Sequence, residues 1–146
     1  MIQSKLSNAT KLKLLMPLLY LVVSILFFVQ SWPKEPQPHN FVGAVMTLMA
    51  FALWIIARIQ LGNAFSLAPK ANFLVTSGLY SKLRHPVYYF SILAVVGIGT
   101  FIWEAYMLLP VVLLVVLEYL RIQKEEKLLV AKFGADYLVY KKRTWI

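Results

Sequence analysis

VYYFSILAVVGIGTFIWEAYMLLPVVLLVVLEY, residues 87 to 119, decides the fold, because these 33 residues carry only two charges, Glu104 and Glu118. A single helix of this length would extend for about 50 Å, whereas the hydrocarbon layer of a bilayer is about 30 Å thick. The stretch therefore predicts two membrane spans that fold back on each other. Glu104 stands among aromatic residues typical of a membrane interface, so we place the turn there and the spans at about 87–102 and 105–120.

Two further apolar stretches precede this pair. Residues 12–30 contain no charge and are long enough to cross a bilayer, and residues 41–57 form a shorter stretch that ends at Arg58. Lysines before the first stretch also fit a secretory signal, but Ser-Trp-Pro at residues 31–33 offers no cleavage site of the small-x-small kind. We therefore expect four spans, with the proline-rich residues 33–38 as a short loop between the first two.

The composition agrees with a membrane protein and excludes several chemistries. Hydrophobic residues make up 60% of the 146 and charged residues 14%, against roughly half and a quarter in soluble domains. The chain has no cysteine, which excludes disulfides and thiolate chemistry. Its histidines are His39 and His85, too few for the usual ligand sets, so we expect no metal site.

The distribution of positive charge tests the span count independently of hydropathy. With four spans and a cytoplasmic amino terminus, 14 of the 15 Lys and Arg residues lie on the cytoplasmic side, and Lys34 alone lies outside. A three-span chain would place the seven basic residues after Leu120 outside, against the positive-inside rule. Topology and attraction to anionic lipid thus explain the net charge of +9, and we expect no nucleic-acid partner.

Residues 60–86 and 121–146 are then the two cytoplasmic segments, and both termini are cytoplasmic. The second segment begins with apolar residues at helical spacing, and Gly134 is placed to end that helix. In the first segment, Pro86 suits the first turn of the third span, because its missing N–H is not needed there. His85 would then stand beside the start of a helix.

Arg84 and His85 make the first candidate site. A helix amino terminus attracts anions, and these two side chains add hydrogen-bond donors, so a carboxylate or phosphate would bind well here. The structural alternative is that Arg84 reaches lipid headgroups and His85 caps the helix, with Tyr88 and Tyr89 in the interfacial aromatic belt.

Arg121 and Glu125 make the second candidate site, because residues four apart share one face of a helix. They either point into a common pocket at the membrane surface or form an ion pair on a solvated helix. Glu118 is unusual too, since a carboxyl group inside the end of the fourth span is costly without a partner. Gly-Ile-Gly at residues 97–99 lacks the third glycine and the preceding strand of a dinucleotide fingerprint, so we interpret it as helix packing.

Four segments around the last two spans together resemble one enzyme family. They are LVTSGLY (74–80), RHPVY (84–88), Arg121 with Glu125-Glu126, and FGADYLVY (133–140). Over about residues 61–143 the sequence resembles the isoprenylcysteine carboxyl methyltransferases, which are integral membrane enzymes that use S-adenosylmethionine. It resembles the phospholipid methyltransferases more distantly.

The resemblance implies a cofactor pocket built from the cytoplasmic loop, the last two spans and the carboxy-terminal helix. The residues it implies for binding S-adenosylmethionine are Asn72, Phe73, Leu74, Val75, Tyr80, His85, Pro86, Val87, Tyr88 and Glu125. Arg121 would orient the methyl acceptor. Only two spans precede the shared segments, fewer than in the longer family members, so the acceptor stays open as a lipophilic or membrane-presented carboxylate, thiol or lipid headgroup.

The sequence thus predicts an all-α integral membrane methyltransferase of one domain, and its short length favours a bacterial inner membrane. Two alternatives stay open. Sterol reductases, which use NADPH, share a related carboxy-terminal pattern, although they have many more spans. A four-span protein that keeps the signature without catalysis is the other alternative. Loss of cofactor binding on changing Glu125 or His85 would separate an enzyme from such a protein.

Overall fold

The computed structural model describes residue 19 and residues 21–61 and 74–145 of the chain. The elements in this part are the helix Leu21–Ser31, α2 (Pro38–Leu61), the 3-10 helix η2 (Gly78–Ser81), α3 (Pro86–Ile102), the 3-10 helix η3 (Ala105–Met107), α4 (Leu108–Phe133) and α5 (Ala135–Arg143). All of these elements are helical, so the expected all-α class is confirmed for the described residues.

Most helix ends lie where the sequence predicts them. Pro38 begins α2 at the end of the proline-rich loop, and Pro86 stands in the first turn of α3. α3 ends at Ile102, because Trp103 takes the left-handed backbone conformation with φ 53°. The chain then turns through Glu104 as predicted and enters η3.

α4 joins two parts of the chain that the sequence analysis treats separately, the fourth apolar stretch and the amphipathic helix after it. It runs without a break from Leu108 to Phe133, since no glycine or proline interrupts residues 121–133. Gly134, with φ 51°, ends the helix as predicted, because glycine adopts positive φ at little cost. The amphipathic helix expected after the fourth span is therefore an extension of the last apolar helix.

Two helices are long and apolar enough to cross a membrane: α2 and the segment Ala105–Phe133, which joins η3 to α4. The helix Leu21–Ser31 and α3 are apolar but shorter. The second and fourth expected spans thus correspond to helices long enough to cross a membrane, and the third corresponds to the shorter α3, while the count of four spans stays a prediction. Most of residues 12–20, the first half of the first expected span, lies outside the described residues.

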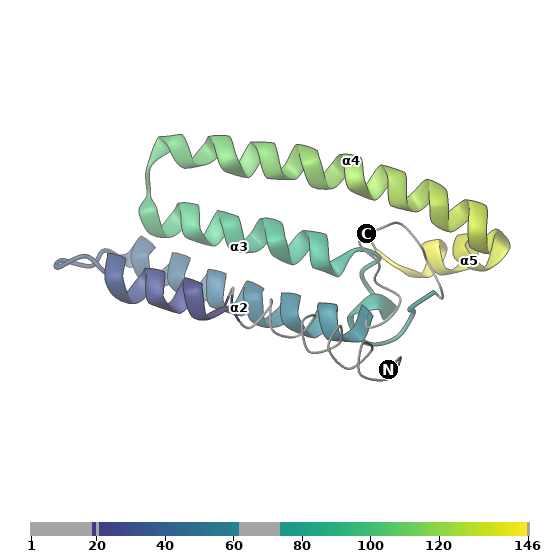
Figure 1. Cartoon of the computed structure of the whole chain (residues 1–146), viewed down its shortest axis with the longest axis horizontal. Helices are drawn as coiled ribbons and strands as arrows, with labels where there is room; N and C mark the ends of the chain where they lie inside the picture. The colour runs from purple at the N-terminus through teal and green to yellow at the C-terminus, as the bar shows by residue number, and fades with distance from the viewer. Residues whose placement is uncertain (1–18, 20, 62–73, 146) are drawn as a thin grey trace, which may run out of the picture.

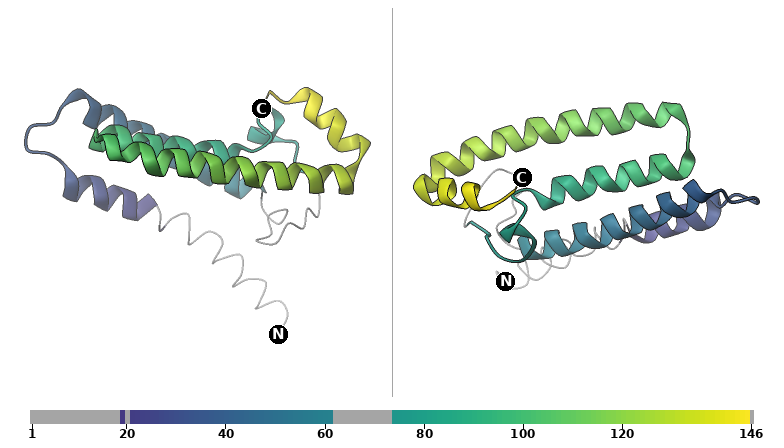
Figure 2. Two further views of the ribbon diagram at one scale, coloured as in Figure 1. Left: turned by 90° about the horizontal axis from the view of Figure 1, so that it is seen from above. Right: turned by 180° about the vertical axis from the view of Figure 1, so that it is seen from behind.

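The three long helices lie side by side, with α3 between α2 and α4 (Figure 1). The view from behind gives the same order, and α5 turns back from the end of α4 toward the start of α3 (Figure 2). The buried apolar core lies at the opposite end of the bundle, where Phe28 packs against Ala44 and Phe101. The Phe28 and Phe101 rings meet edge to face at 4.8 Å.

The interface between α2 and α3 is built from small residues. A Cβ atom added to Gly97 would collide with the Thr47 side chain, and one added to Gly43 would lie 2.6 Å from the carbonyl oxygen of Gly97. Thr47 is fully buried there, and its hydroxyl donates to the Gly43 carbonyl at 2.8 Å. The packing role expected for Gly97 is thus confirmed.

Candidate active site

The candidate site lies at the end of the bundle where α3 begins and α4 continues past it (Figure 1). Three parts of the chain meet here: the loop of residues 74–86, the extension of α4, and α5. Gly78 starts the turn of η2 with φ 63°, and its neighbour Leu79 donates its backbone N–H to Gln60 Oε1 at 2.8 Å. This contact fixes the loop to the end of α2.

His85 stands at the centre of the site, at the N-cap position of α3. Its side chain makes no capping hydrogen bond, contrary to the structural alternative considered above. The ring is 5% exposed instead and faces two carboxylates, with Nδ1 3.5 Å from Glu125 Oε2 and Nε2 3.6 Å from Glu126 Oε1. The structure thus brings together His85 from the first predicted constellation and Glu125 from the second.

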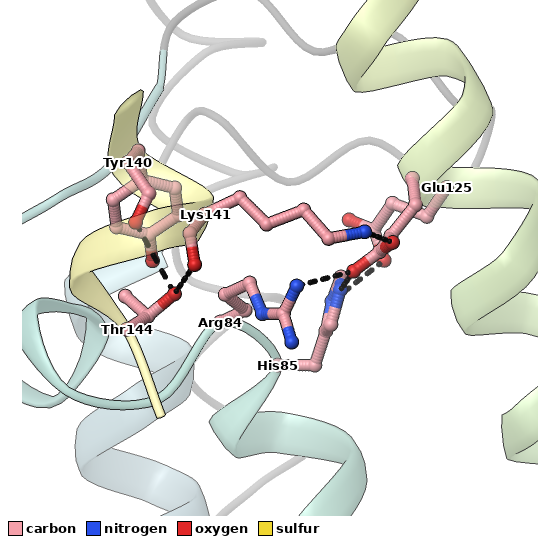
Figure 3. Close-up of polar contacts among 7 residues, drawn as sticks. Arg84, His85, Glu125, Tyr140, Lys141 and Thr144 are labelled. Carbon is pink, nitrogen blue, oxygen red and sulfur yellow. Dashed lines mark hydrogen bonds and ion pairs between the residues drawn. The ribbon is translucent and has the colours of Figure 1, made fainter. Parts of the chain in front are cut away.

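Glu126 holds two cations from different parts of the chain. Arg84 Nη1 donates to its Oε1 at 3.1 Å, and Lys141 Nζ from α5 donates to its Oε2 at 2.5 Å (Figure 3). Burial alone would raise the pKa of Glu126, but the hydrogen bond from Lys141 and the charge of Arg84 outweigh it and lower the pKa. Arg84 is therefore part of a charged cluster, with its side chain only 17% exposed, and does not reach out to headgroups.

Glu125 is the second carboxylate beside His85. Burial acts to raise its pKa, while His85 and then Tyr88 lower it through interactions with the ionised form, and the net pKa is below the ordinary value. Glu125 Oε2 is nevertheless buried without a hydrogen bond of good geometry, as are His85 Nε2 and Arg84 Nε. Hydrogen-bonding capacity of both kinds, donors and an acceptor, therefore remains unused in one small region.

α5 closes the site from the side of the chain terminus. The Tyr140 hydroxyl donates to the backbone carbonyl of Tyr80 at 2.7 Å, and the backbone N–H of Trp145 donates to the carbonyl of Lys82 at 2.9 Å. Burial raises the pKa of Tyr140 to about 12 and raises the pKa of Tyr80 as well. Both phenols are therefore protonated at neutral pH, and α5 is held to the loop by neutral hydrogen bonds as well as by Lys141.

Arg121 forms its ion pair with a carboxylate other than Glu125, although it shares a helix with Glu125. Its Nη1 atom is 3.6 Å from Glu118 Oε2, one turn earlier in α4, and its side chain is 67% exposed. Glu118 in turn accepts a hydrogen bond from Ser91 of α3 at 3.3 Å. The structure thus pairs Arg121 with Glu118, and the described contacts contain no ion pair between Arg121 and Glu125.

The other predicted residues are distributed along the same region. Leu74 and Val75 are half-buried in a segment without regular secondary structure, and Tyr80 is buried in η2. Pro86, Val87 and Tyr88 form the first turn of α3, and the Tyr88 ring lies 5.8 Å from the His85 ring, centroid to centroid. Asn72 and Phe73 lie outside the described residues.

Three residues of the region were not predicted as members of the site. Lys141 reaches Glu126 from α5, Ser91 reaches Glu118 from α3, and Arg58 at the end of α2 lies within electrostatic reach of Tyr80 and Tyr88. Arg58 has a sequence signal, since it follows the second apolar stretch directly. Lys141 and Ser91 have none, because a single lysine in a basic tail and a single serine in an apolar helix are common. Their roles depend on the fold.

The family model of the phospholipid methyltransferases matches residues 39–136, about two thirds of the chain. The chain belongs to the phospholipid methyltransferase family. The match includes α2, α3 and α4, and thus both Arg84-His85 and Glu125-Glu126. It confirms the more distant of the two resemblances drawn from the sequence. Searches among curated proteins and among solved structures found no match.

Proposed function

We propose that this chain is an integral membrane enzyme that transfers a methyl group from S-adenosylmethionine to a lipophilic or membrane-presented acceptor. The observation that carries the proposal is the buried His85 between two carboxylates, Glu125 and Glu126, inside the part of the chain that matches a methyltransferase family. Four spans with both termini in the cytoplasm would place this cluster at the cytoplasmic face, in a bacterial inner membrane.

The unused hydrogen-bonding atoms of the cluster fit such a cofactor. Its amino acid part carries a carboxylate and an ammonium, and its sulfonium is a second cation. Arg84 Nε and His85 Nε2 are buried donors suited to the carboxylate, and Glu125 Oε2 is a buried acceptor suited to an ammonium or a ribose hydroxyl. A group with charges of both signs satisfies all three atoms, whereas a simple anion or cation leaves some of them unpaired.

When bound, the cofactor supplies an electrophilic methyl group on a positively charged sulfur. The chain's own residues would bind it, orient it and exclude water, which are the main requirements of an in-line displacement. Leu74, Val75, Tyr80 and Tyr88 offer apolar and aromatic surface for the adenine, with Pro86 and Val87 in the first turn of α3. Asn72 and Phe73 complete the proposed set through the family resemblance.

Arg121 belongs to the acceptor side of the site in this proposal. Its guanidinium is exposed and lies next to Glu118. Glu118 is about two turns of α4 before Glu126, in the direction of the proposed membrane span. We propose that it orients a polar group of the acceptor at the membrane surface. The acceptor classes compatible with such a position are a carboxylate, a thiol and a lipid headgroup.

Calorimetric titration of the detergent-purified protein with S-adenosylmethionine tests the proposal, with NADPH as the competing ligand. We expect saturable binding of S-adenosylmethionine and none of NADPH. Glu125→Gln removes one charge with little change of shape and should weaken binding at least about tenfold, equivalent to about 1.4 kcal/mol. Glu104→Gln, which changes an exposed carboxylate at the opposite end, is the matched control. Equal affinity of both variants would contradict the proposed site, and binding of NADPH instead would favour a reductase.

A further inference from the structure

Tyr137 of α5 is a buried tyrosine whose hydroxyl has no role in packing. Its side chain is 0% exposed and is the largest of the fully buried side chains among the described residues. The hydroxyl oxygen is buried without a hydrogen bond of good geometry. A buried hydroxyl costs free energy unless it is hydrogen-bonded, so phenylalanine would fill the same space at a lower cost. The hydroxyl therefore has a reason other than packing.

Tyr140, one turn later in α5, shows what a tyrosine with a structural role does in this helix. Its hydroxyl donates to the backbone carbonyl of Tyr80 at 2.7 Å and so fixes α5 to the loop. The two rings lie 6.1 Å apart, centroid to centroid, yet the Tyr137 hydroxyl lies within hydrogen-bonding reach of a different group, the carboxylate of Glu126. Burial raises the pKa of Tyr137, and the charge of Glu126 raises it further. The phenol is therefore protonated at neutral pH and can donate to that carboxylate.

Glu126 is the carboxylate at which three segments of the chain meet. Arg84 Nη1 donates to it at 3.1 Å and Lys141 Nζ at 2.5 Å, while His85 Nε2 lies 3.6 Å away (Figure 3). Tyr137 and Lys141 are four residues apart, so they share one face of α5. The phenol of Tyr137 thus adds a neutral donor beside the cation of Lys141. A further donor restricts the orientation of the carboxylate, and with it the positions of the two side chains from the loop that face it.

We propose that Tyr137 is a positioning residue of the cofactor site: its hydroxyl donates to Glu126 and holds that carboxylate, and through it Arg84 and His85, in the arrangement that binds S-adenosylmethionine. The inference rests on the proposed function and deepens it, because it makes α5 a determinant of cofactor affinity. Tyr137 acts through Glu126 without touching the cofactor. Loss of its hydroxyl should therefore change two measurable properties, the titration of Glu126 and the affinity for the cofactor.

The first measurement follows the titration of Glu126 in the absence of cofactor, by NMR of the detergent-purified protein labelled with ¹³C at glutamate Cδ. The chain has five glutamates, and Glu126→Gln identifies the signal of Glu126. Hydrogen-bond donors and cations lower the pKa of Glu126, so loss of a donor in Tyr137→Phe should move the midpoint of this signal to higher pH. The titratable and charged groups that face Glu126 in the described contacts are Arg84, His85, Glu125, Tyr137 and Lys141. Of these, Tyr137 alone changes in the comparison.

Tyr140→Phe is the matched control for the titration. It removes the same atom from the same helix, but from a hydroxyl that donates to a backbone carbonyl. The midpoint of Glu126 should therefore stay close to the wild-type value in this variant. An unmoved midpoint in Tyr137→Phe overturns the inference. An equal shift in both variants also overturns it, because that result would show a general loosening of α5.

The second measurement is the Kd for S-adenosylmethionine, determined by calorimetry. Tyr137→Phe should raise the Kd about fivefold at neutral pH, the size of effect expected from one hydrogen bond. The loss should grow as the pH falls, because Glu126 takes up its proton at a higher pH in the variant than in the wild type. Tyr106→Phe, in an exposed turn at the opposite end, should bind as the wild type does. A Kd for Tyr137→Phe within about twofold of the wild-type value overturns the positioning role.

These measurements distinguish failure of the inference from failure of the proposed function. A wild type that does not bind S-adenosylmethionine overturns the proposed function and the positioning role with it. A wild type that binds, together with a Tyr137→Phe variant that binds equally well, overturns the positioning role alone. Tyr137→Phe keeps the buried ring, so its thermal unfolding midpoint should stay close to that of the wild type. A loss of affinity that Tyr140→Phe reproduces in full would indicate a structural role of α5 and would likewise overturn the inference.

Discussion

The two faces of α3 are packed in opposite ways. Toward α2 the helices approach closely along their length, through Gly43, Thr47 and Gly97. Toward α4 the packing is sparser, and polar contacts join the two sides, from Ser91 to Glu118 and from His85, at the N-cap of α3, to Glu125. One face of α3 is therefore a structural interface, and the other carries the proposed site.

The difference follows from the interactions that hold helices together in lipid and at its surface. Apolar side chains gain little from packing on each other in lipid, so helices associate there through small residues that allow close backbone contact and through hydrogen bonds. The α2–α3 pair has both features. α4 has large aliphatic side chains in its apolar part, such as Leu109 and Leu113, which suit contact with lipid better than with a helix. The ion pair of His85 with Glu125 joins α4 to the start of α3, where the proposed spans end.

The largest effect is expected from filling the α2–α3 contact. A Cβ atom at Gly43 would lie 2.6 Å from both the Gly97 oxygen and the Phe101 Cα, and backbone atoms cannot turn away as a side chain can. Gly43→Ala should therefore destabilise the protein by about 3 kcal/mol or prevent folding. The thermal unfolding midpoint in detergent measures the change.

Gly99→Ala is the matched control for this prediction. Gly99 lies in α3, the helix that packs against α2 in this interface, but an added Cβ atom would meet only the Met107 side chain at 3.5 Å, an ordinary contact. Alanine also favours helix over glycine by up to about 1 kcal/mol. We expect Gly99→Ala to unfold at the wild-type temperature or above it. Equal losses in both variants would show that the α2–α3 approach is looser than described.

The next largest effect concerns the charged end of α4. Glu126→Gln weakens charge-assisted hydrogen bonds to Arg84 and Lys141 and should cost about 2 kcal/mol at neutral pH. Because the pKa of Glu126 lies below its ordinary value of 4.5, the stability it contributes is present above the unfolded value and is lost as the pH falls through the folded pKa. Unfolding midpoints between pH 7 and pH 3 should therefore converge for wild type and variant at the acid end.

The sequence predicted the helical elements well because their signals are local. Length and hydropathy identified the apolar stretches, Pro86 identified a helix start, and Gly134 a helix end. The turn at Glu104 was predicted because residues 87–119 would be too long for a bilayer as a single helix. The continuity of α4 through residue 120 was not predicted, since a change from apolar to charged residues marks a change of environment and need not mark a change of backbone.

The site was only partly predictable, because its contacts join distant segments. His85 and Glu125 were both candidates, yet each was considered with a sequence neighbour, and their contact joins residues 40 positions apart. Spacing on a helix placed Arg121 with Glu125 correctly on one element, but the ion pair of Arg121 is with Glu118, one turn earlier in the same helix. Sequence periodicity shows which face a residue occupies and does not show what stands opposite.

A smaller effect is expected at the far end of the α2–α3 pair. Asn40 is buried, and its Nδ2 donates to the carbonyl of Phe101, in the last turn of α3, while its Oδ1 accepts from the Gln37 N–H. Asn40→Ala leaves the Phe101 carbonyl and the Gln37 N–H without this partner. It should lower the free energy of unfolding by about 1.5 kcal/mol, measured from the thermal unfolding midpoint in detergent. Thr100→Val removes a hydroxyl that bonds only within its own helix, so it should change the midpoint little. A wild-type unfolding midpoint in Asn40→Ala would mean that the close approach at Gly43 and Gly97 alone defines the interface.

The smallest effect is expected where α5 meets the loop, because one neutral hydrogen bond is involved. Tyr140→Phe removes the 2.7 Å bond to the Tyr80 carbonyl and keeps the buried ring, so the loss should be about 1 kcal/mol. Tyr106→Phe, in an exposed turn at the opposite end, is the control. Hydrogen exchange of α5 and η2 should rise in Tyr140→Phe while that of α2 and α3 stays unchanged, since the α2–α3 contact does not depend on α5. A rise throughout the bundle would show instead that the two faces of α3 are one cooperative unit.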